Sequence, residues 1–72
     1  MERGEATKGL AGREDRFRLA LEQVRRYGQI TNQQYQALNK VSESTASRDL
    51  ARLVELGSLK SAGRGPARRY LL

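Results

Sequence analysis

The fold of this chain is decided by residues 30–57, which read ITNQQYQALNKVSESTASRDLARLVELG. This stretch predicts a short capped helix, a tight turn and a longer helix that begins polar and ends apolar. Thr31 has Gln34 three residues after it, which is the spacing of a capping box at a helix start. Ser42 is suited to cap the longer helix, and Gly57 is suited to end it. Two helices joined in this way are the sequence form of a helix-turn-helix.

The longer helix, expected over residues 43–56, has two sides of different character. At about 100° per residue its apolar side chains fall on one side, which predicts that this side packs on a core. The inward residues are Ala46, Leu50, Leu53 and Val54. The outward residues are Ser44, Ser47, Arg48 and Ala51, with Thr45 and Arg52 on the flanks. The helix therefore has one side for the fold and another side for a partner.

The turn between the two helices is expected at residues 39–41. Asn39 tolerates the left-handed conformation that such a turn needs. Val41 is expected to be buried at the corner. The short helix before the turn is expected to end near Leu38, with Tyr35 on the same side as Leu38.

A first helix is expected from Arg13 to a stop at Gly28. Its apolar stripe comprises Phe17, Ala20, Leu21, Val24 and Tyr27. We interpret this helix as scaffold. Ile30 is expected in a short extended segment, pointing inward. Residues 1–12 show no periodic pattern and are interpreted as a flexible lead-in or the end of an interdomain linker, which leaves residues 13–72 as the folded domain.

A hairpin is expected over residues 58–72. Its first strand begins at Leu59, and its turn is the glycine-rich sequence GRGP. The second strand is expected from Arg68 to Leu72, with Tyr70 and Leu72 on one face and Tyr70 as a lid over the core. The predicted fold class is mainly α with a small β-hairpin, a winged helix-turn-helix with three helices and a two- to three-stranded wing.

The composition favours a basic, single-domain protein without thiol or imidazole chemistry. The chain has 72 residues, enough for one small domain, and it contains neither cysteine nor histidine. Fourteen Lys and Arg against eight Asp and Glu give a net charge of +6, which suits a polyanion. Residues 31–57 balance three basic against three acidic residues, whereas residues 58–72 carry four basic residues and no acid. Most of the positive excess therefore lies in the hairpin.

No apolar run approaches the roughly 20 residues of a membrane span. The N-terminus also lacks the apolar stretch of a secretory signal. We therefore expect a cytoplasmic protein that has no membrane partner.

The outward side of the longer helix and the hairpin together predict an interface for double-stranded DNA. Small side chains let a helix approach a groove closely, and hydroxyl groups suit phosphate oxygens. Arg48 adds a planar fork for a guanine edge or a phosphate. Arg64 and Arg69 are expected on phosphates or in the minor groove. The candidate DNA-binding residues are Ser44, Thr45, Ser47, Arg48, Arg52, Lys60, Arg64, Arg68 and Arg69.

Asp49 is expected to have a structural role, facing neither the core nor the outward side squarely. Its expected partner is an arginine of the first helix or Arg52. No second acid, metal ligand or nucleophile accompanies it, so we expect no enzyme activity, no metal site and no cofactor. The glycine-rich turn is followed by neither a helix nor a lysine-serine pair, which argues against a nucleotide-binding loop.

The run VSESTASRDLARLVELGSLK resembles the DeoR-type winged helix-turn-helix, whose pattern is Val-Ser-x-x-Thr-x-x-Arg-Asp-Leu-x-x-Leu-x-x-x-Gly. The pattern falls on Val41, Ser42, Thr45, Arg48, Asp49, Leu50, Leu53 and Gly57. With ITNQQYQAL upstream and AGRGPARRYLL at the end, residues 29–72 also resemble the C-terminal winged-helix domain of Fic-family and RecG-related ATP-binding proteins. The resemblance implies that DNA is faced by Ser44, Thr45, Ser47 and Arg48, and that the wing carries Arg64 and Arg69.

Two functions remain open from the sequence. The first is a DNA-binding module of a transcriptional regulator, or of a larger helicase-related or Fic-type protein, with helix 43–56 in the major groove and hairpin 58–72 on the backbone. A homodimer or a tethered parent domain would strengthen such binding. The alternative is a protein-interaction or dimerisation module that regulates an attached enzyme, because the longer helix has a balanced charge and Ala46 and Ala51 give it a smooth surface.

Overall fold

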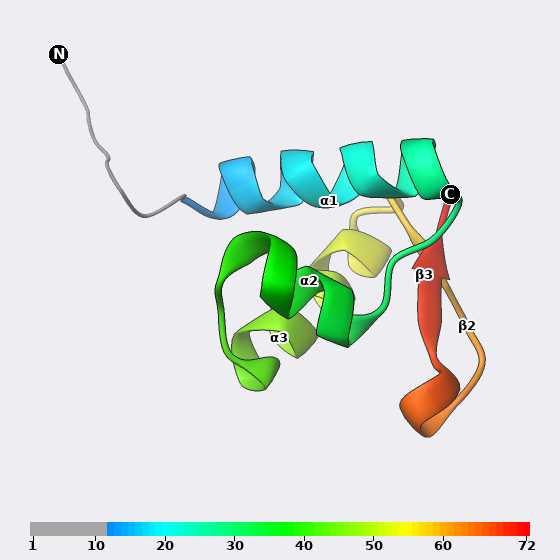
Figure 1. Ribbon diagram of the computed structural model, residues 1–72. Coiled ribbons are helices and arrows are strands. Elements are labelled where there is room, and N and C mark those ends of the chain that lie inside the picture. The colour runs from blue at the N-terminus through cyan, green and yellow to red at the C-terminus, as the bar shows by residue number, and fades with distance from the viewer. Residues whose placement is uncertain (1–11) are drawn as a thin grey trace, which may run out of the picture.

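The computed structural model describes residues 12–72, so the expected lead-in lies outside the described residues except for Gly12. The elements in chain order are α1 (Arg13–Tyr27), α2 (Asn32–Asn39), α3 (Glu43–Glu55), β2 (Lys60–Ala62), a 3₁₀ turn (Gly65–Ala67) and β3 (Arg69–Leu71). Figure 1 shows α1 lying across α2 and α3, with the hairpin of β2 and β3 beside the helices. This arrangement confirms the predicted fold class, a helix-rich domain with a small β-hairpin.

The hairpin is joined to the helical part through Ile30. β2 and β3 are antiparallel, with Ser61 opposite Tyr70. On the other edge of β3, the Ile30 N–H donates to the Tyr70 carbonyl at 2.9 Å, and the Tyr70 N–H donates to the Ile30 carbonyl at 2.8 Å. The expected extended segment before α2 is therefore a single bridge, and it fixes β3 next to the start of α2.

The core lies between the three helices and the base of the hairpin. Its buried residues are Ala20, Val24, Ile30, Tyr35, Ala46, Leu50, Leu53, Leu59 and Tyr70. The predicted inward stripe of α3 is thus confirmed, with Val54 half-buried at its margin. Two expectations are wrong, since Tyr27 is 65% exposed at the end of α1 and Leu72 is 55% exposed beyond the end of β3. Tyr70 is buried as predicted, whereas Leu72 is not.

The helix ends follow the capping signals in the sequence. The Thr31 hydroxyl accepts from the Gln34 N–H at 3.1 Å, and the Gln34 side chain accepts from the Thr31 N–H at 2.9 Å. Ser42 caps α3 by accepting from the Thr45 N–H at 3.2 Å. Gly57 follows α3 with φ 79°, and the Ser58 N–H then reaches back to the Leu53 carbonyl at 2.9 Å. This is a Schellman ending, for which glycine is suited.

The turn between α2 and α3 differs from its prediction. Lys40, not Asn39, adopts the left-handed conformation, with φ 56° and ψ 50°. Asn39 stays in the last turn of α2 because its side-chain amide donates to the Arg16 carbonyl of α1 at 3.3 Å. Val41 is half-buried and packs against the core. The packing of α1 on α2 therefore moves the left-handed residue one position along the chain.

The hairpin tip contains a glycine that its turn requires. Gly63 has φ 82°, and a Cβ atom built there would lie 2.7 Å from the Ala67 carbonyl oxygen. The strands are shorter than expected, because β2 begins one residue after Leu59 and β3 one residue after Arg68. Among residues 12–72, no helix is both long enough and apolar enough to cross a membrane.

Replacing Lys40 by glycine is expected to stabilise the domain by about 1 kcal/mol relative to Lys40→Ala, because only glycine adopts the left-handed conformation without a Cβ clash. Lys40→Ala is the matched control, since it also removes the exposed side chain. The free energy of unfolding of both variants is measured in urea. Equal stabilities of the two variants would contradict the left-handed assignment.

Candidate nucleic-acid interface

The outward side of α3 is held in place by a buried carboxylate on its inner flank. Asp49 is only 4% exposed and binds residues of the other two helices. Arg16 of α1 donates through Nε to Asp49 Oδ2 at 2.7 Å and through Nη2 to Oδ1 at 3.4 Å. The Tyr35 hydroxyl of α2 donates to Oδ2 at 2.7 Å. The structural role predicted for Asp49 fits this geometry, but the residue is more deeply buried than expected.

These contacts also set the ionisation of the cluster. Burial by itself raises the pKa of Asp49, but the hydrogen bonds from Arg16 and Tyr35 and the charge of Arg16 outweigh it and hold this pKa below its ordinary value. Burial and the hydrogen bond to Asp49 raise the pKa of Tyr35 well above its ordinary value. Asp49 is therefore an anion and Tyr35 a neutral donor at neutral pH.

The predicted outward residues of α3 lie on the surface as a set. Ser44, Ser47, Arg48, Ala51 and Arg52 are exposed, and Thr45 is half-buried. Arg52, the other predicted partner of Asp49, instead forms an ion pair with Glu55 at 3.1 Å. The side chains near the start of α3 are short, and the first cation, Arg48, stands beside the buried Asp49. The outward side therefore has short side chains at its start, with its positive charge at Arg48 near the middle of the helix and at Arg52 one turn later.

An open groove separates the start of α3 from the hairpin. Its walls come from α2, α3 and the hairpin, and most of its lining residues have polar side chains. The lining residues are Asn32, Gln33, Gln36, Glu43, Ser47, Gly65, Arg68 and Tyr70. Of the predicted site residues, this groove brings Ser47 and Arg68 together across the space between helix and hairpin.

Asn32 fixes the orientation of Ser47 in this groove. The Asn32 amide donates to Ser47 Oγ at 2.9 Å, and its own oxygen accepts from the Gln36 amide at 2.6 Å. Because Ser47 Oγ accepts one hydrogen bond from within the protein, its hydroxyl proton is left to donate to a ligand. Sequence reasoning missed these α2 amides, although the amide-rich start of α2, NQQ, was a visible signal.

A second hollow borders the other flank of α3, where the helix meets α1. Arg48, Ala51 and Arg52 line it from α3, together with Asp49 and Glu55. Arg13 and Arg16 line it from the first turns of α1. The structure thus brings two predicted site residues, Arg48 and Arg52, together with an arginine that the sequence analysis did not select, Arg13.

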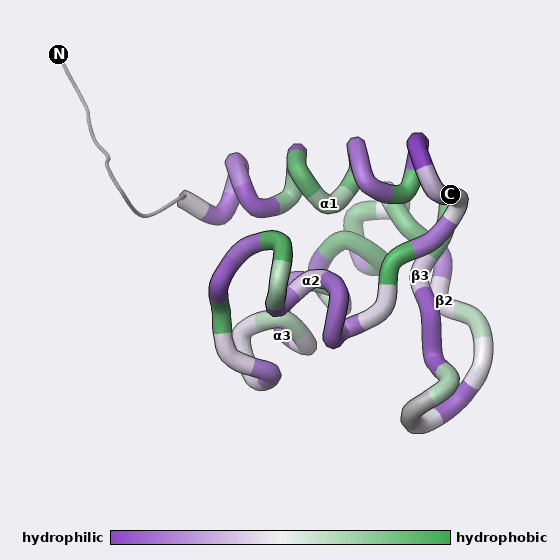
Figure 2. Tube along the Cα trace, viewed as in Figure 1, coloured by the Kyte–Doolittle hydropathy of each residue, from purple (hydrophilic) through white to green (hydrophobic). Residues whose placement is uncertain are grey.

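The four cations of the hairpin are exposed but do not share one face. Tyr70 points into the core, so its strand neighbour Arg69 points to the opposite face, because side chains alternate along a strand. Lys60, whose pairing partner Leu71 also neighbours Tyr70, lies on the same outer face as Arg69. Arg68 lines the groove, and Arg64 is at the tip. Figure 2 shows the hydrophilic stretch that leads into β3.

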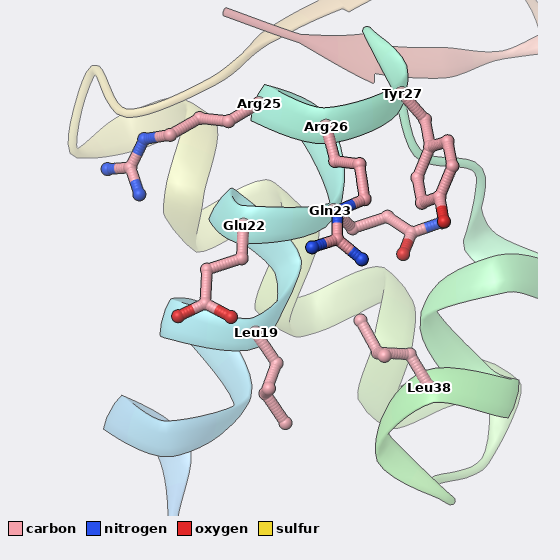
Figure 3. Close-up of a pocket in the computed structure, with 7 residues that line it drawn as sticks. All are labelled: Leu19, Glu22, Gln23, Arg25, Arg26, Tyr27 and Leu38. Atoms are coloured by element: carbon pink, nitrogen blue, oxygen red, sulfur yellow. The ribbon is translucent and has the colours of Figure 1, made fainter.

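A different kind of hollow lies between α1 and the end of α2. Figure 3 shows Leu19 and Leu38 on opposite sides of it, with Gln23, Arg26 and Tyr27 above and Glu22 pointing away. Arg25 and Arg26 line it together with Glu22, but no residue of α3 or of the hairpin takes part. Among residues 12–72, no group of three acidic, histidine or cysteine side chains is placed to hold a metal ion.

Comparisons of this chain with family models, curated proteins and solved structures gave no match.

The lowered pKa of the buried Asp49 carboxylate predicts that the domain loses stability in acid. The unfolded Asp49 has an ordinary pKa of about 3.9, and the folded pKa is lower, so the unfolded chain takes up this proton first as the pH falls. Its contribution to stability is full above about pH 4 to 5 and is lost as the pH falls through the folded pKa. The free energy of unfolding of Asp49→Asn should lie about 3 kcal/mol below that of the parent at pH 7, and this gap should narrow in acid.

Urea unfolding of both proteins between pH 7 and pH 2.5 measures this gap. Asp15→Asn is the control, because Asp15 forms an exposed ion pair with Arg18 at 3.1 Å and such pairs add little to stability. A gap for Asp49→Asn that stays constant throughout the titration would show that the carboxylate is not held as an anion by its partners.

Proposed function

We propose that this domain binds double-stranded DNA, with α3 in the major groove and the hairpin along the backbone. The observation that carries the proposal is the outward side of α3, on which small and hydroxyl side chains are exposed next to Arg48, while the neighbouring Asp49 is turned inward and paired with Arg16. An α-helix whose outward side chains are this short fits the width of a major groove. The hollows on both flanks of α3 contain arginines.

The charge distribution supports the same proposal. Burial of Asp49 beside Arg16 removes one of the three acids of residues 31–57 from the surface. The hairpin contributes four exposed cations and no acid. Phosphate contacts fix the position of a protein on DNA, whereas contacts to base edges provide specificity. We therefore assign attraction mainly to the hairpin and base contact mainly to Ser47, with Arg48 on a base edge or a phosphate.

The resemblance to DeoR-type and to Fic- and RecG-related winged helices agrees with this proposal, since it covers α3 and the hairpin. In a larger regulator or helicase-related protein, a tether or a second copy would raise the effective concentration of so small a module on DNA. We propose that the isolated domain binds DNA weakly and in a salt-sensitive manner, and that the larger protein or a dimer binds DNA more tightly.

Fluorescence anisotropy with a labelled 20-base-pair duplex across a salt series tests the proposed function. Affinity should fall steeply with salt, because each neutralised phosphate adds about 0.9 to the slope of log K against log salt. Arg48→Ala should weaken binding by about fivefold or more, and Arg64→Ala should weaken it similarly while lowering the slope by about 1.

Arg25→Ala is the matched control for charge. Arg25 is exposed in the last turn of α1 and lines neither hollow beside α3, so its loss should change affinity much less. If no binding is detected at low salt and sedimentation shows a stable dimer, the DNA proposal is wrong and the interaction module takes its place.

A further inference from the structure

The hollow between the start of α1 and α3 brings two arginines of α1 next to two arginines of α3 that are already assigned to DNA. Arg13 and Arg16 approach it from α1, and Arg48 and Arg52 approach it from α3. Arg13, Arg48 and Arg52 are exposed, whereas Arg16 is half-buried and engaged with Asp49. Three extended cations therefore border one open hollow.

The acids of this hollow do little to neutralise these cations. Asp49 is buried and its oxygens already accept hydrogen bonds from Arg16 and Tyr35. Glu55 pairs with Arg52 at 3.1 Å, but both side chains are about half exposed or more, at 68% and 49%. An exposed pair of this kind is weak and can exchange for a phosphate. The hollow thus retains a net positive charge and donors that suit an anion.

Arg13 is placed for this task by a contact within its own helix. Its guanidinium lies 5.9 Å from the centre of the Phe17 ring, one turn along α1. A cation above an aromatic face is attracted to it and keeps its outward N–H groups available. Phe17 in turn packs against the core. The first residue of α1 therefore has a defined direction beside α3.

The position of the hollow indicates its ligand. It borders α3 on one flank, and the groove with Arg68 borders α3 on the other. A helix in a major groove has one phosphate backbone on each side of it. We infer that the hollow formed by Arg13, Arg48 and Arg52 binds a backbone phosphate of the DNA strand opposite to the one that the hairpin contacts. The inference rests on the proposed function and adds Arg13 as a direct phosphate-binding residue.

The test compares Arg13→Ala with Arg25→Ala, which removes the same charge from the other end of α1. In the anisotropy assay at about 0.1 M salt, Arg13→Ala should weaken binding by about fivefold and lower the salt slope by about 1. Arg13→Lys keeps the charge and should restore most of the affinity. The double variant Arg13→Ala/Arg64→Ala should lower the slope by about 2, because the two residues contact separate phosphates. Thermal unfolding of each variant verifies that it is folded.

The outcomes separate this inference from the proposed function. Binding by the parent together with equal effects of Arg13→Ala and Arg25→Ala would overturn the phosphate site and leave DNA binding standing. A double variant whose slope equals that of Arg64→Ala alone would also overturn it. If the folded parent shows no salt-dependent binding of DNA, both proposals fail. A selective loss at Arg13 with rescue by lysine supports the site.

Discussion

The bidentate contact of Arg16 with Asp49, completed by the Tyr35 hydroxyl, is the interaction on which the rest of the structure depends. It joins α1, α2 and α3 at one carboxylate, in a domain whose apolar core contains few large side chains. Leaving such a charge buried without a partner costs several kcal/mol, so the three helices are compatible with only a narrow range of packings. The same contact orients α3, since Asp49 turned inward places Arg48 on the outer surface.

The fold and the proposed interface are therefore two results of one helix orientation. The stripe that ends in Leu53 enters the core, and the outward side remains small and polar. Residues 31–57 have as many acidic as basic residues, but their exposed surface has a more positive charge because one of the acids, Asp49, is buried. A charge count taken along the chain misses this difference between composition and surface.

The elements that the sequence predicted well are those governed by local rules. The caps at Thr31 and Ser42, the stop at Gly57 and the spacing of the inward stripe all depend on neighbours within one turn. The predictions that failed depend on distant parts of the chain. Asn39 lost the left-handed position because α1 supplies a carbonyl for its side chain, and Leu72 is exposed because the pairing of β3 ends before it. The approach of Arg13 to α3 follows from helix packing, which no local pattern encodes.

The paired hydrogen bonds between Ile30 and Tyr70 have a thermodynamic consequence for recognition. Ile30 stands immediately before the cap of α2, so the hairpin is anchored at the start of the helix-turn-helix. The distance between hairpin and α3 is then established during folding, and a ligand that touches both meets contacts already in register. The entropy cost of fixing the hairpin relative to α3 is met during folding and not during binding. More of the free energy of each contact with the ligand is therefore available for affinity. A disordered basic arm of the same charge would lack this advantage.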